Sequence, residues 1–214
     1  MSVRLTGVRL LLLVALTGVF VLPTGGSASA EAPADGITLD VVSVNGSGCP
    51  PGTANVSVLP DSTGFRVTYR EFLARAGGSA NPVDFRKNCQ LNVLVHVPQG
   101  FTFAIASADY RGRASLAAGA SALQRTNYYF QGSADNNYVD HTFAGPFSAV
   151  WQTTDETPVT ELVYAPCGEF RNLNINTELR VYEGTVNPTK ISSMSMRTTD
   201  GNVDTIVHFS WKQC

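Results

Sequence analysis

Apolar and polar side chains alternate along much of this chain, and this alternation constrains the fold more than any other feature. In the clearest run, the apolar positions are Cys89, Leu91, Val93, Val95 and Val97. Successive residues of a β-strand point to opposite faces of a sheet, so a period of two predicts a strand with one buried face. His96 falls on the polar face, where we expect a solvated or hydrogen-bonded side chain. Pro98-Gln99-Gly100 supplies turn residues, and the alternation resumes from Phe101 to Ile105 in a second predicted strand.

Similar short runs of β-prone residues, bounded by turn residues, occur throughout the chain. The further predicted strands are Ile37–Val44, Ala54–Leu59, Phe65–Leu73, Thr126–Gln131, Tyr138–Phe143, Phe147–Thr153, Thr160–Tyr164 and Asn172–Tyr182. Near the end, Asp200-Gly201 separates Met194–Thr198 from Val203–Trp211, which predicts a hairpin of these two segments. Leu116–Arg125 has the composition of a short helix, but Gly119 interrupts it and strands flank it closely, so a helix is disfavoured there.

Many short strands with regular turn signals, and no long helical segments between them, are typical of one fold class. We expect an all-β protein: an antiparallel β-sandwich, similar to a jelly roll and crosslinked by disulfides. A closed barrel is the alternative. The sequence shows no internal repeat that would indicate a propeller or a solenoid.

The first 30 residues have the features of a secretory signal peptide. Arg4 and Arg9 accompany an apolar run from Leu10 to Leu22, and Ala28-Ser29-Ala30 offers the small residues that signal peptidase requires. A membrane anchor is the alternative, but the run is shorter than the roughly 20 residues that span a bilayer. We therefore predict cleavage after Ala30, an N-terminal strand or extension in residues 31–45, and a β-sandwich domain in residues 46–214.

The predicted mature chain is small and mildly acidic. It has 184 residues with 13 basic and 17 acidic side chains, so its formal net charge is −4. Such a balance lacks the positive charge typical of nucleic-acid-binding proteins, and no second apolar segment is long enough to cross a membrane. This length supports one substantial core. We therefore expect a single secreted domain, monomeric, with neither nucleic acid nor membrane as a partner.

Four cysteines follow the leader: Cys49, Cys89, Cys167 and Cys214. An even number in an exported protein indicates disulfides, because the compartment is oxidising. Three connectivities are possible, and we favour Cys49–Cys89 with Cys167–Cys214, since each bond then joins sequence neighbours and closes a loop of moderate length. The absence of a CxxC motif from the sequence disfavours a redox motif or a paired-knuckle zinc site.

Several short motifs along the chain resemble those of one protein family. They are GSGCPPG (46–52), FRKNCQLN (85–92), DYRGRA (109–114), TNYYFQG (126–132), APCG (165–168), LNIN (173–176) and WKQC (211–214). Together they are similar to a family of small secreted four-cysteine proteins of fungi and bacteria that is described only as a domain of unknown function. The resemblance covers roughly Gly46 to Cys214. It implies an exported, disulfide-bonded single domain, and it implies no activity, cofactor or catalytic residue.

Histidines and carboxylates are the candidates for chemistry. His96, His141 and His208 lie on separate predicted strands. Asp140-His141 could serve as an acid/base or metal-binding pair, but adjacent strand residues point to opposite faces, so the two are not expected to converge. Asp155-Glu156, which precede Pro158, are expected to cap a loop.

Hydrolase and calcium chemistry have weak support. No GxSxG pentapeptide marks a serine nucleophile, and a glycosidase usually needs two facing carboxylates. Asp109, Asp135 and Asp140 could line an edge suited to calcium, but their spacing is not that of an EF-hand loop, and turns with Asx hydrogen bonds are favoured. We therefore predict no catalytic residue, no metal and no cofactor.

Binding at the surface is a further possibility. Tyr110–Arg113 and Arg125–Phe130 combine aromatic rings with guanidinium groups, which suit stacking on sugar rings or pairing with acidic polymers. From these segments Tyr110, Arg111 and Tyr129 are the predicted glycan contacts. Core packing is the competing interpretation, because alternation sends half of such aromatic residues inward. Asn45 and Asn55 begin N-glycosylation motifs, whose use depends on the producing cell.

Two functions from different classes are therefore considered. The favoured one is a secreted, non-catalytic binding or structural module that acts at a cell wall or on an extracellular glycan. The alternative is a secreted hydrolase of a polysaccharide or an ester, with an active site built from loops. The module is favoured because the sequence reveals no convergent set of reactive side chains.

Overall fold

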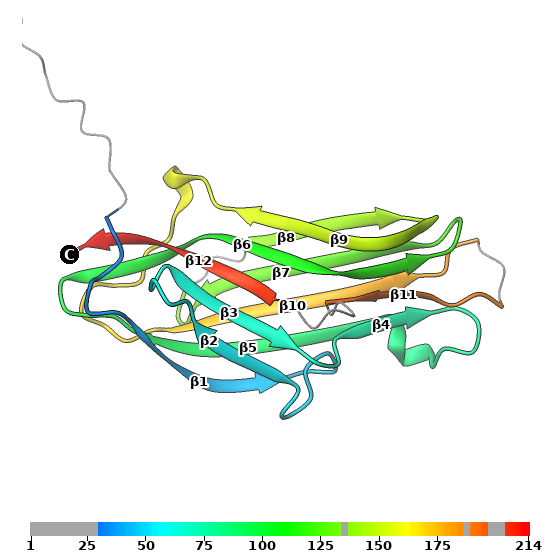
Figure 1. Ribbon diagram of the computed structural model, residues 1–214, viewed down its shortest axis with the longest axis horizontal. Helices are drawn as coiled ribbons and strands as arrows, with labels where there is room; N and C mark the ends of the chain where they lie inside the picture. Colours follow the sequence, from blue (N-terminus) through cyan, green and yellow to red (C-terminus); the bar gives the residue numbers. More distant parts are fainter. Residues whose placement is uncertain (1–29, 134–136, 186–188, 197–203) are drawn as a thin grey trace, which may run out of the picture.

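Two antiparallel β-sheets pack face to face, with their long strands running along the long axis of the molecule (Figure 1). The computed structural model describes residues 30–133, 137–185, 189–196 and 204–214, so the predicted signal peptide before Ala30 lies outside the described residues. The described strands are β1 (Thr38–Asn45), β2 (Ala54–Val58), β3 (Gly64–Tyr69), β4 (Leu73–Ala76), β5 (Arg86–His96), β6 (Phe101–Leu116), β7 (Ser121–Phe130), β8 (Asn137–Ala144), β9 (Phe147–Glu156), β10 (Asn172–Tyr182), β11 (Ser192–Ser195) and β12 (Asp204–Gln213). Two short 3-10 helices, η1 (Pro82–Phe85) and η2 (Val159–Glu161), complete the described elements. The predicted antiparallel all-β sandwich is confirmed.

The smaller sheet has five strands in the order β1-β5-β10-β7-β8 among the described residues. The larger sheet follows the order β2-β3-β12-β6-β11-β4, and β9 pairs with β6. The 16-residue strand β6 organises the larger sheet, because it pairs with β12 along its first half and with β9 and β11 along its second half. Strand β1 is an edge strand of the smaller sheet, so the N-terminal strand is an integral part of the sandwich.

The two inward faces carry the apolar positions that the alternation predicts. The buried positions include Leu91, Val93 and Val95 of β5 and Leu173, Ile175, Leu179 and Val181 of β10. From the larger sheet, Phe103 packs against Phe209 of β12 at 4.6 Å between ring centroids. It also reaches across the sandwich to Phe130 of β7 at 5.5 Å. Removing such apolar surface from water contributes about 25 cal/mol per Å² and is the main force holding the sheets together.

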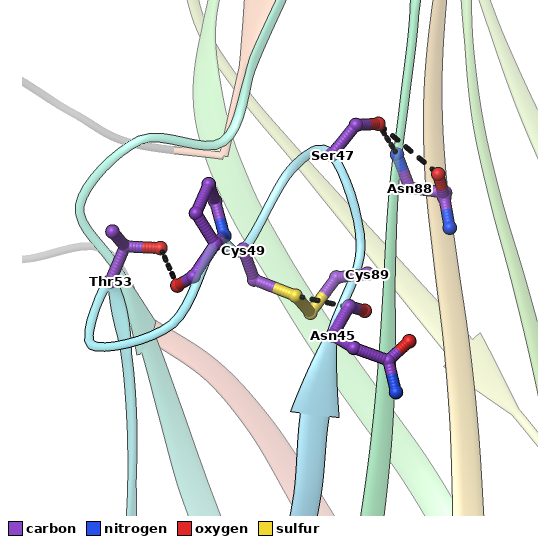
Figure 2. Close-up of a disulfide and its surroundings, with 7 residues drawn as sticks. Asn45, Ser47, Cys49, Thr53, Asn88 and Cys89 are labelled. Atoms are coloured by element: carbon purple, nitrogen blue, oxygen red, sulfur yellow. Dashed lines mark hydrogen bonds between the residues drawn. A yellow bond between two sulfur atoms is a disulfide. The ribbon is translucent and has the colours of Figure 1, made fainter.

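Both disulfides have the pairing favoured from the sequence, Cys49–Cys89 and Cys167–Cys214, and no cysteine is free. The first bond joins the loop after β1 to strand β5 (Figure 2). The second joins the loop between η2 and β10 to the last residue, whose amide also donates to the Gly100 carbonyl at 2.8 Å. Each bond therefore fixes an irregular segment to the end of a long strand.

The GSGC segment before the first disulfide follows the surface of β5 closely (Figure 2). Ser47 Oγ accepts a hydrogen bond from the backbone N–H of Asn88 at 3.2 Å and donates to the side-chain Oδ1 of Asn88 at 3.1 Å. Gly46 has a φ of +136°, and a Cβ there would lie 2.2 Å from the Asn88 carbonyl oxygen. Only glycine permits this approach, which brings Cys49 to its partner.

The hairpin predicted around Asp200-Gly201 is wrong, although the turn itself lies outside the described residues. Strand β11 pairs with β4 and β6, whereas β12 pairs with β3 and β6. The two strands therefore lie against different parts of β6 and do not pair with each other. A turn motif predicts only that the chain changes direction locally. Which strands pair depends on the burial of apolar side chains across the whole sheet.

Two other segments differ from the prediction, and a third agrees with it. Thr160–Tyr164 is not a strand, because Glu161 N donates to the Pro158 carbonyl at 2.7 Å and closes the single turn of η2. The predicted strand Phe65–Leu73 is divided between β3 and β4. Leu116–Arg125 contains no helix; its turn, with Gly119 at a φ of +86°, connects β6 of the larger sheet to β7 of the smaller sheet.

Candidate functional site

The three predicted glycan contacts do not lie together. Tyr110 is 0% exposed and lies between the sheets, so the prediction that it contacts a surface ligand is wrong. Its neighbour Arg111 is exposed on the outer face of the larger sheet. Tyr129, by contrast, lies on the outer face of the smaller sheet, because the adjacent Tyr128 points inward to the other sheet. Strand alternation thus divides each continuous sequence motif between two faces.

The outer face of the smaller sheet carries a group of amide side chains. This amide face consists of Gln90, Asn92, Asn127, Asn174 and Asn176. In the sheet register, Asn174 lies between Asn92 of β5 and Tyr129 of β7, and Asn176 lies between Gln90 and Asn127. Asn92 Nδ2 donates to Asn174 Oδ1 at 2.8 Å, which fixes the orientation of both amides.

The amide face contains two buried amides and is bordered by an exposed tyrosine. Asn127 and Asn174 are only 1% and 6% exposed. Tyr138 of β8 is opposite Asn127 in the register and is 61% exposed, so its ring projects from the sheet beside these amides. The guanidinium carbon of Arg125 lies 5.5 Å from the centre of this ring, a cation–π contact that restricts its motion.

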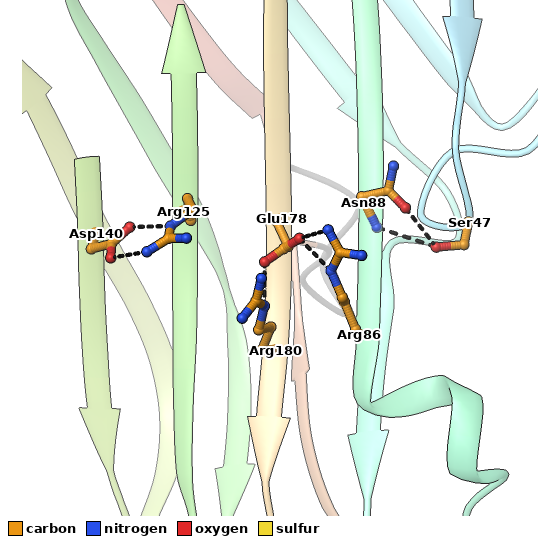
Figure 3. Close-up of polar contacts among 7 residues, drawn as sticks. All are labelled: Ser47, Arg86, Asn88, Arg125, Asp140, Glu178 and Arg180. Carbon is orange, nitrogen blue, oxygen red and sulfur yellow. Dashed lines mark hydrogen bonds and ion pairs between the residues drawn. The ribbon is translucent and has the colours of Figure 1, made fainter. Parts of the chain in front are cut away.

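One end of the same face carries an arginine cluster, made of Arg86, Arg125, Asp140, Glu178 and Arg180 (Figure 3). Glu178 is 8% exposed and accepts hydrogen bonds from both Arg86 and Arg180. Arg125 donates to Asp140 through Nε at 2.6 Å and through Nη2 at 2.5 Å. Three guanidinium groups accompany two carboxylates, which leaves one excess positive charge.

Hydrogen bonding sets the protonation states in this cluster. The hydrogen bonds between Arg125 and Asp140 lower the pKa of the Asp140 carboxyl and raise the pKa of the Arg125 guanidinium. Hydrogen bonding to Tyr182, followed by that to Glu178, raises the pKa of Arg180. The Asp140 carboxylate and the guanidinium groups of Arg125 and Arg180 are therefore charged at neutral pH.

A second polar group lies between the sheets. His141 Nε2 is 2.6 Å from Asp155 Oδ1, and Tyr128 Oη donates to Asp155 Oδ2 at 3.0 Å. Burial raises the pKa of the Asp155 carboxyl, and the hydrogen bond with His141 opposes that rise. A cavity of about 70 Å³ adjoins Tyr128 and Asp155. The expectation that Asp155 and Glu156 cap a loop is wrong, because β9 continues to Glu156 and takes Asp155 into the interior.

Asp140 and His141 diverge as expected, the first toward Arg125 on the outer face and the second toward Asp155 between the sheets. His208 and Thr154 likewise contact a shared carboxylate, that of Asp109, at 3.1 and 2.6 Å. In both groups the carboxylate is the central member. A Ser-His-Asp triad instead places the imidazole between the acid and the hydroxyl. Neither group has the connectivity that activates a nucleophile.

Two further expectations concern His96 and metal binding. His96 Nε2 lies 2.7 Å from Asp40 Oδ2, in accord with a hydrogen-bonded histidine on the polar face. Within the described ranges, no three His, Cys, Asp or Glu side chains gather in a way that could hold a metal ion. Asp109 and Asp140 lie on different sheets and so do not share an edge, and Asp135 is outside the described residues.

The arginine cluster was mostly missed from the sequence. Arg125 belongs to a segment that was considered for binding from the sequence, and Asp140 was considered for metal binding, but Arg86, Glu178 and Arg180 were not considered for either role. The available signal was the alternation of β10, which places Asn174, Asn176, Glu178 and Arg180 on one face. The register of β10 against β5 and β7, which brings the three arginines together, was not available from the alternation.

Comparison with known proteins agrees with the motifs. The chain matches the family described as "Domain of unknown function (DUF4360)" over residues 35–214. It is 34% identical over 192 residues to an "Uncharacterized secreted protein" of Arthroderma benhamiae, and the match covers 90% of this chain and 77% of the fungal protein. In the described part of the chain, no helix has the length and apolar character needed to span a membrane. The chain therefore belongs to the family described as a domain of unknown function, DUF4360.

Proposed function

We propose that this protein is exported and is a non-catalytic module that binds an extracellular or cell-wall polysaccharide on its amide face. The observation that carries the proposal is a group of amide side chains from three adjacent strands, with Tyr129 and Tyr138 beside them. Gln90, Asn92 and Asn176 are partly exposed and can meet a ligand, while the buried Asn127 and Asn174 support them from beneath. Export is supported by the leader sequence, by the two disulfides and by the secreted fungal relative.

The chemistry of amides suits sugar hydroxyls. Each Asn or Gln side chain offers a carbonyl acceptor and two N–H donors, and each sugar hydroxyl both donates and accepts. Neighbouring hydroxyls of one ring can therefore bind a single amide through two hydrogen bonds. The rings of Tyr129 and Tyr138 add apolar surface that can pack against the C–H face of a sugar.

The sheet also prepares these side chains for binding. Their backbones are fixed by the β5–β10 and β10–β7 ladders, and the Asn92–Asn174 hydrogen bond fixes two of the amides directly. Ordering a flexible side chain on binding costs about 0.5–1.5 kcal/mol, so a surface that is ordered beforehand binds more tightly.

The alternative function, a hydrolase of a polysaccharide or an ester, has one observation in its favour, the His141–Asp155 pair beside a cavity. That cavity measures about 70 Å³, whereas small-molecule sites usually measure about 300 Å³ or more. The hydroxyl in this group, that of Tyr128, binds the carboxylate and not the imidazole. Both points favour the binding module.

Retention on insoluble polysaccharides tests the proposal. The mature protein is mixed with cellulose, chitin and β-glucan, and the bound fraction is measured at increasing protein concentration. We expect saturable retention on at least one of them. The variants Gln90→Ala and Tyr138→Ala should weaken it by about tenfold each, since a contact worth about 1.4 kcal/mol changes affinity by that factor. Gln152→Ala, which removes an exposed glutamine from the outer face of the larger sheet, is the matched control and should have no effect.

A parallel assay for released sugars separates the two functions. Retention without soluble products supports the module. Release of products that stops in His141→Asn supports the hydrolase and refutes the non-catalytic assignment. Equal losses in Gln90→Ala and Gln152→Ala would refute the assignment of binding to the amide face.

A further inference from the structure

We infer that the arginine cluster gives the amide face a preference for acidic polysaccharides, whose uronate carboxylates bind the guanidinium groups. This inference rests on the glycan-binding function proposed above and adds the charge of the ligand. It follows from the unused hydrogen-bond donors of the cluster, its excess charge and the groove beside it.

The cluster has more guanidinium N–H groups than its own carboxylates use. A guanidinium group has five N–H donors. Arg86 contacts Glu178 through Nε and Nη2, and Arg180 contacts it through Nε. Arg180 also donates a hydrogen bond to Tyr182. The side chains of Arg86 and Arg180 are 50% and 30% exposed, whereas that of Glu178 is 10% exposed. The buried Glu178 carboxylate thus orients the guanidinium groups of Arg86 and Arg180. Their remaining N–H groups face solvent and can bind a second carboxylate.

The charge of the cluster complements an anion. Asp140 neutralises Arg125, but Glu178 alone accompanies both Arg86 and Arg180. The excess positive charge stands out because the chain as a whole is acidic, with a formal net charge of −2. Guanidinium groups also match the planar geometry of a carboxylate, to which they can donate two parallel hydrogen bonds.

A groove continues from the cluster at the end of the sheet. Its lining includes one arginine, Arg75, and one carboxylate, Glu183, together with Asn81, Phe85 and Tyr182. Its volume is about 660 Å³, within the roughly 300–1,000 Å³ of small-molecule sites. Phe85 precedes Arg86, and Tyr182 lies on the same face of β10 as Arg180. Phe85 and Tyr182 are 43% and 41% exposed. Two accessible aromatic rings therefore border a concave surface next to the cluster, an arrangement suited to sugar rings.

The amide face and the cluster form one continuous row on β10. Asn174, Asn176, Glu178 and Arg180 occupy alternate positions of the strand. At about 3.3 Å per residue, the row is about 20 Å long. A linear polysaccharide lying along β10 would therefore contact amides with its hydroxyls and the cluster with a charged group.

Calorimetric titration with two matched oligosaccharides tests the inference. Oligogalacturonate carries a carboxylate on each sugar, and its fully methyl-esterified form has the same backbone without the charges. We expect the mature protein to bind oligogalacturonate about tenfold more tightly, as expected for one charge-assisted hydrogen bond. Added NaCl should reduce this difference, because salt screens exposed charges.

Two arginine variants locate the effect. Arg180→Gln should weaken oligogalacturonate binding by about tenfold and leave binding of the methyl ester unchanged. Arg111→Gln removes an exposed arginine from the opposite sheet and should change neither. Because Arg180→Gln leaves Glu178 with one fewer partner, its folding is checked by circular dichroism. If it fails to fold, Tyr182→Ala, which keeps the ion pairs of Glu178, should still weaken binding of both oligosaccharides through the groove.

Several outcomes would overturn the inference. Equal affinity for both oligosaccharides would remove the preference for acidic sugars, and retention on neutral polysaccharides would then leave the proposed function standing. Equal binding of poly-glutamate would show a general anion site with no part in sugar recognition. Failure to bind any of the glycans, neutral or acidic, would remove both the inference and the proposed function.

Discussion

Removing the Cys49–Cys89 disulfide should destabilise the protein more than removing Cys167–Cys214. The two bonds have sequence separations of 40 and 47 residues. On the chain-entropy model, each therefore stabilises the fold by about 4 kcal/mol. The difference comes from burial, because Cys49 and Cys89 are 0% and 2% exposed, whereas Cys167 and Cys214 are exposed. Replacing the first pair by alanine also leaves a cavity, at a further cost of about 1–2 kcal/mol.

The assay is urea unfolding of two double variants, Cys49→Ala/Cys89→Ala and Cys167→Ala/Cys214→Ala, without reductant. A loss of about 5–6 kcal/mol is a large part of the roughly 5–15 kcal/mol of a typical domain, so the first variant should be measured at low temperature. In thermal scans its Tm should fall by roughly 10–20 °C. Equal losses would show that burial of the first bond adds nothing. A larger loss in the second variant would refute the reasoning, as would free thiols in the denatured, unreduced wild type.

Three further predictions follow from individual contacts. Gly112→Ala should lower the free energy of unfolding by about 2 kcal/mol or more, because a Cβ there would lie 1.9 Å from the Ser195 carbonyl oxygen and 2.6 Å from the Trp151 ring. Thermal scans measure the loss, with Ser115→Ala at an exposed position as the control variant. Equal Tm values for the two variants would contradict the prediction. Asp155 has a raised folded-state pKa, so its contribution to stability is greatest at low pH and is lost as the pH rises through that pKa. Urea unfolding should therefore show that the free energy of unfolding of Asp155→Asn rises relative to that of the wild type between about pH 4 and pH 7. A change in the opposite direction would contradict the burial argument. Asp140 has a lowered pKa, so its contribution to stability is present at neutral pH and is lost on acidification. Arg125→Gln removes its ion-pair partner and should lower the free energy of unfolding at neutral pH by no more than about 1 kcal/mol, since the pair is partly exposed. The same urea unfolding experiment in acid should show no difference from the wild type.

Local pattern was sufficient to predict the fold class and several strands. The bounds of β10 coincide with the predicted Asn172–Tyr182, and β5 extends the alternating run at Cys89 by a few residues. The alternation is informative in these strands because one face packs on the core and the other meets solvent. It was also enough to separate Asp140 from His141, whose side chains lie on opposite faces of β8.

Expectations that depended on long-range pairing were less successful. Asp200-Gly201 indicated a local hairpin, but β11 and β12 each pair with β6. Likewise, the segment around Tyr110 did not indicate that β9 would pair with β6 there. Alternation left both core packing and surface contact open for the Tyr110 ring, which is buried. Register and sheet order result from burial summed over many strands, and a window of ten residues does not contain that information.

The same alternation explains why conspicuous motifs divide between two roles. Tyr128 binds Asp155 between the sheets, while Tyr129 lies on the outer face beside Asn174. At each such pair, one residue packs between the two sheets and its neighbour lies on the outer face. Residues that bind a long polymer should therefore be sought at every second position of neighbouring strands, and not in consecutive residues of one motif. On this protein that rule selects the outward row of β10, from the amides of Asn174 and Asn176 to the guanidinium of Arg180.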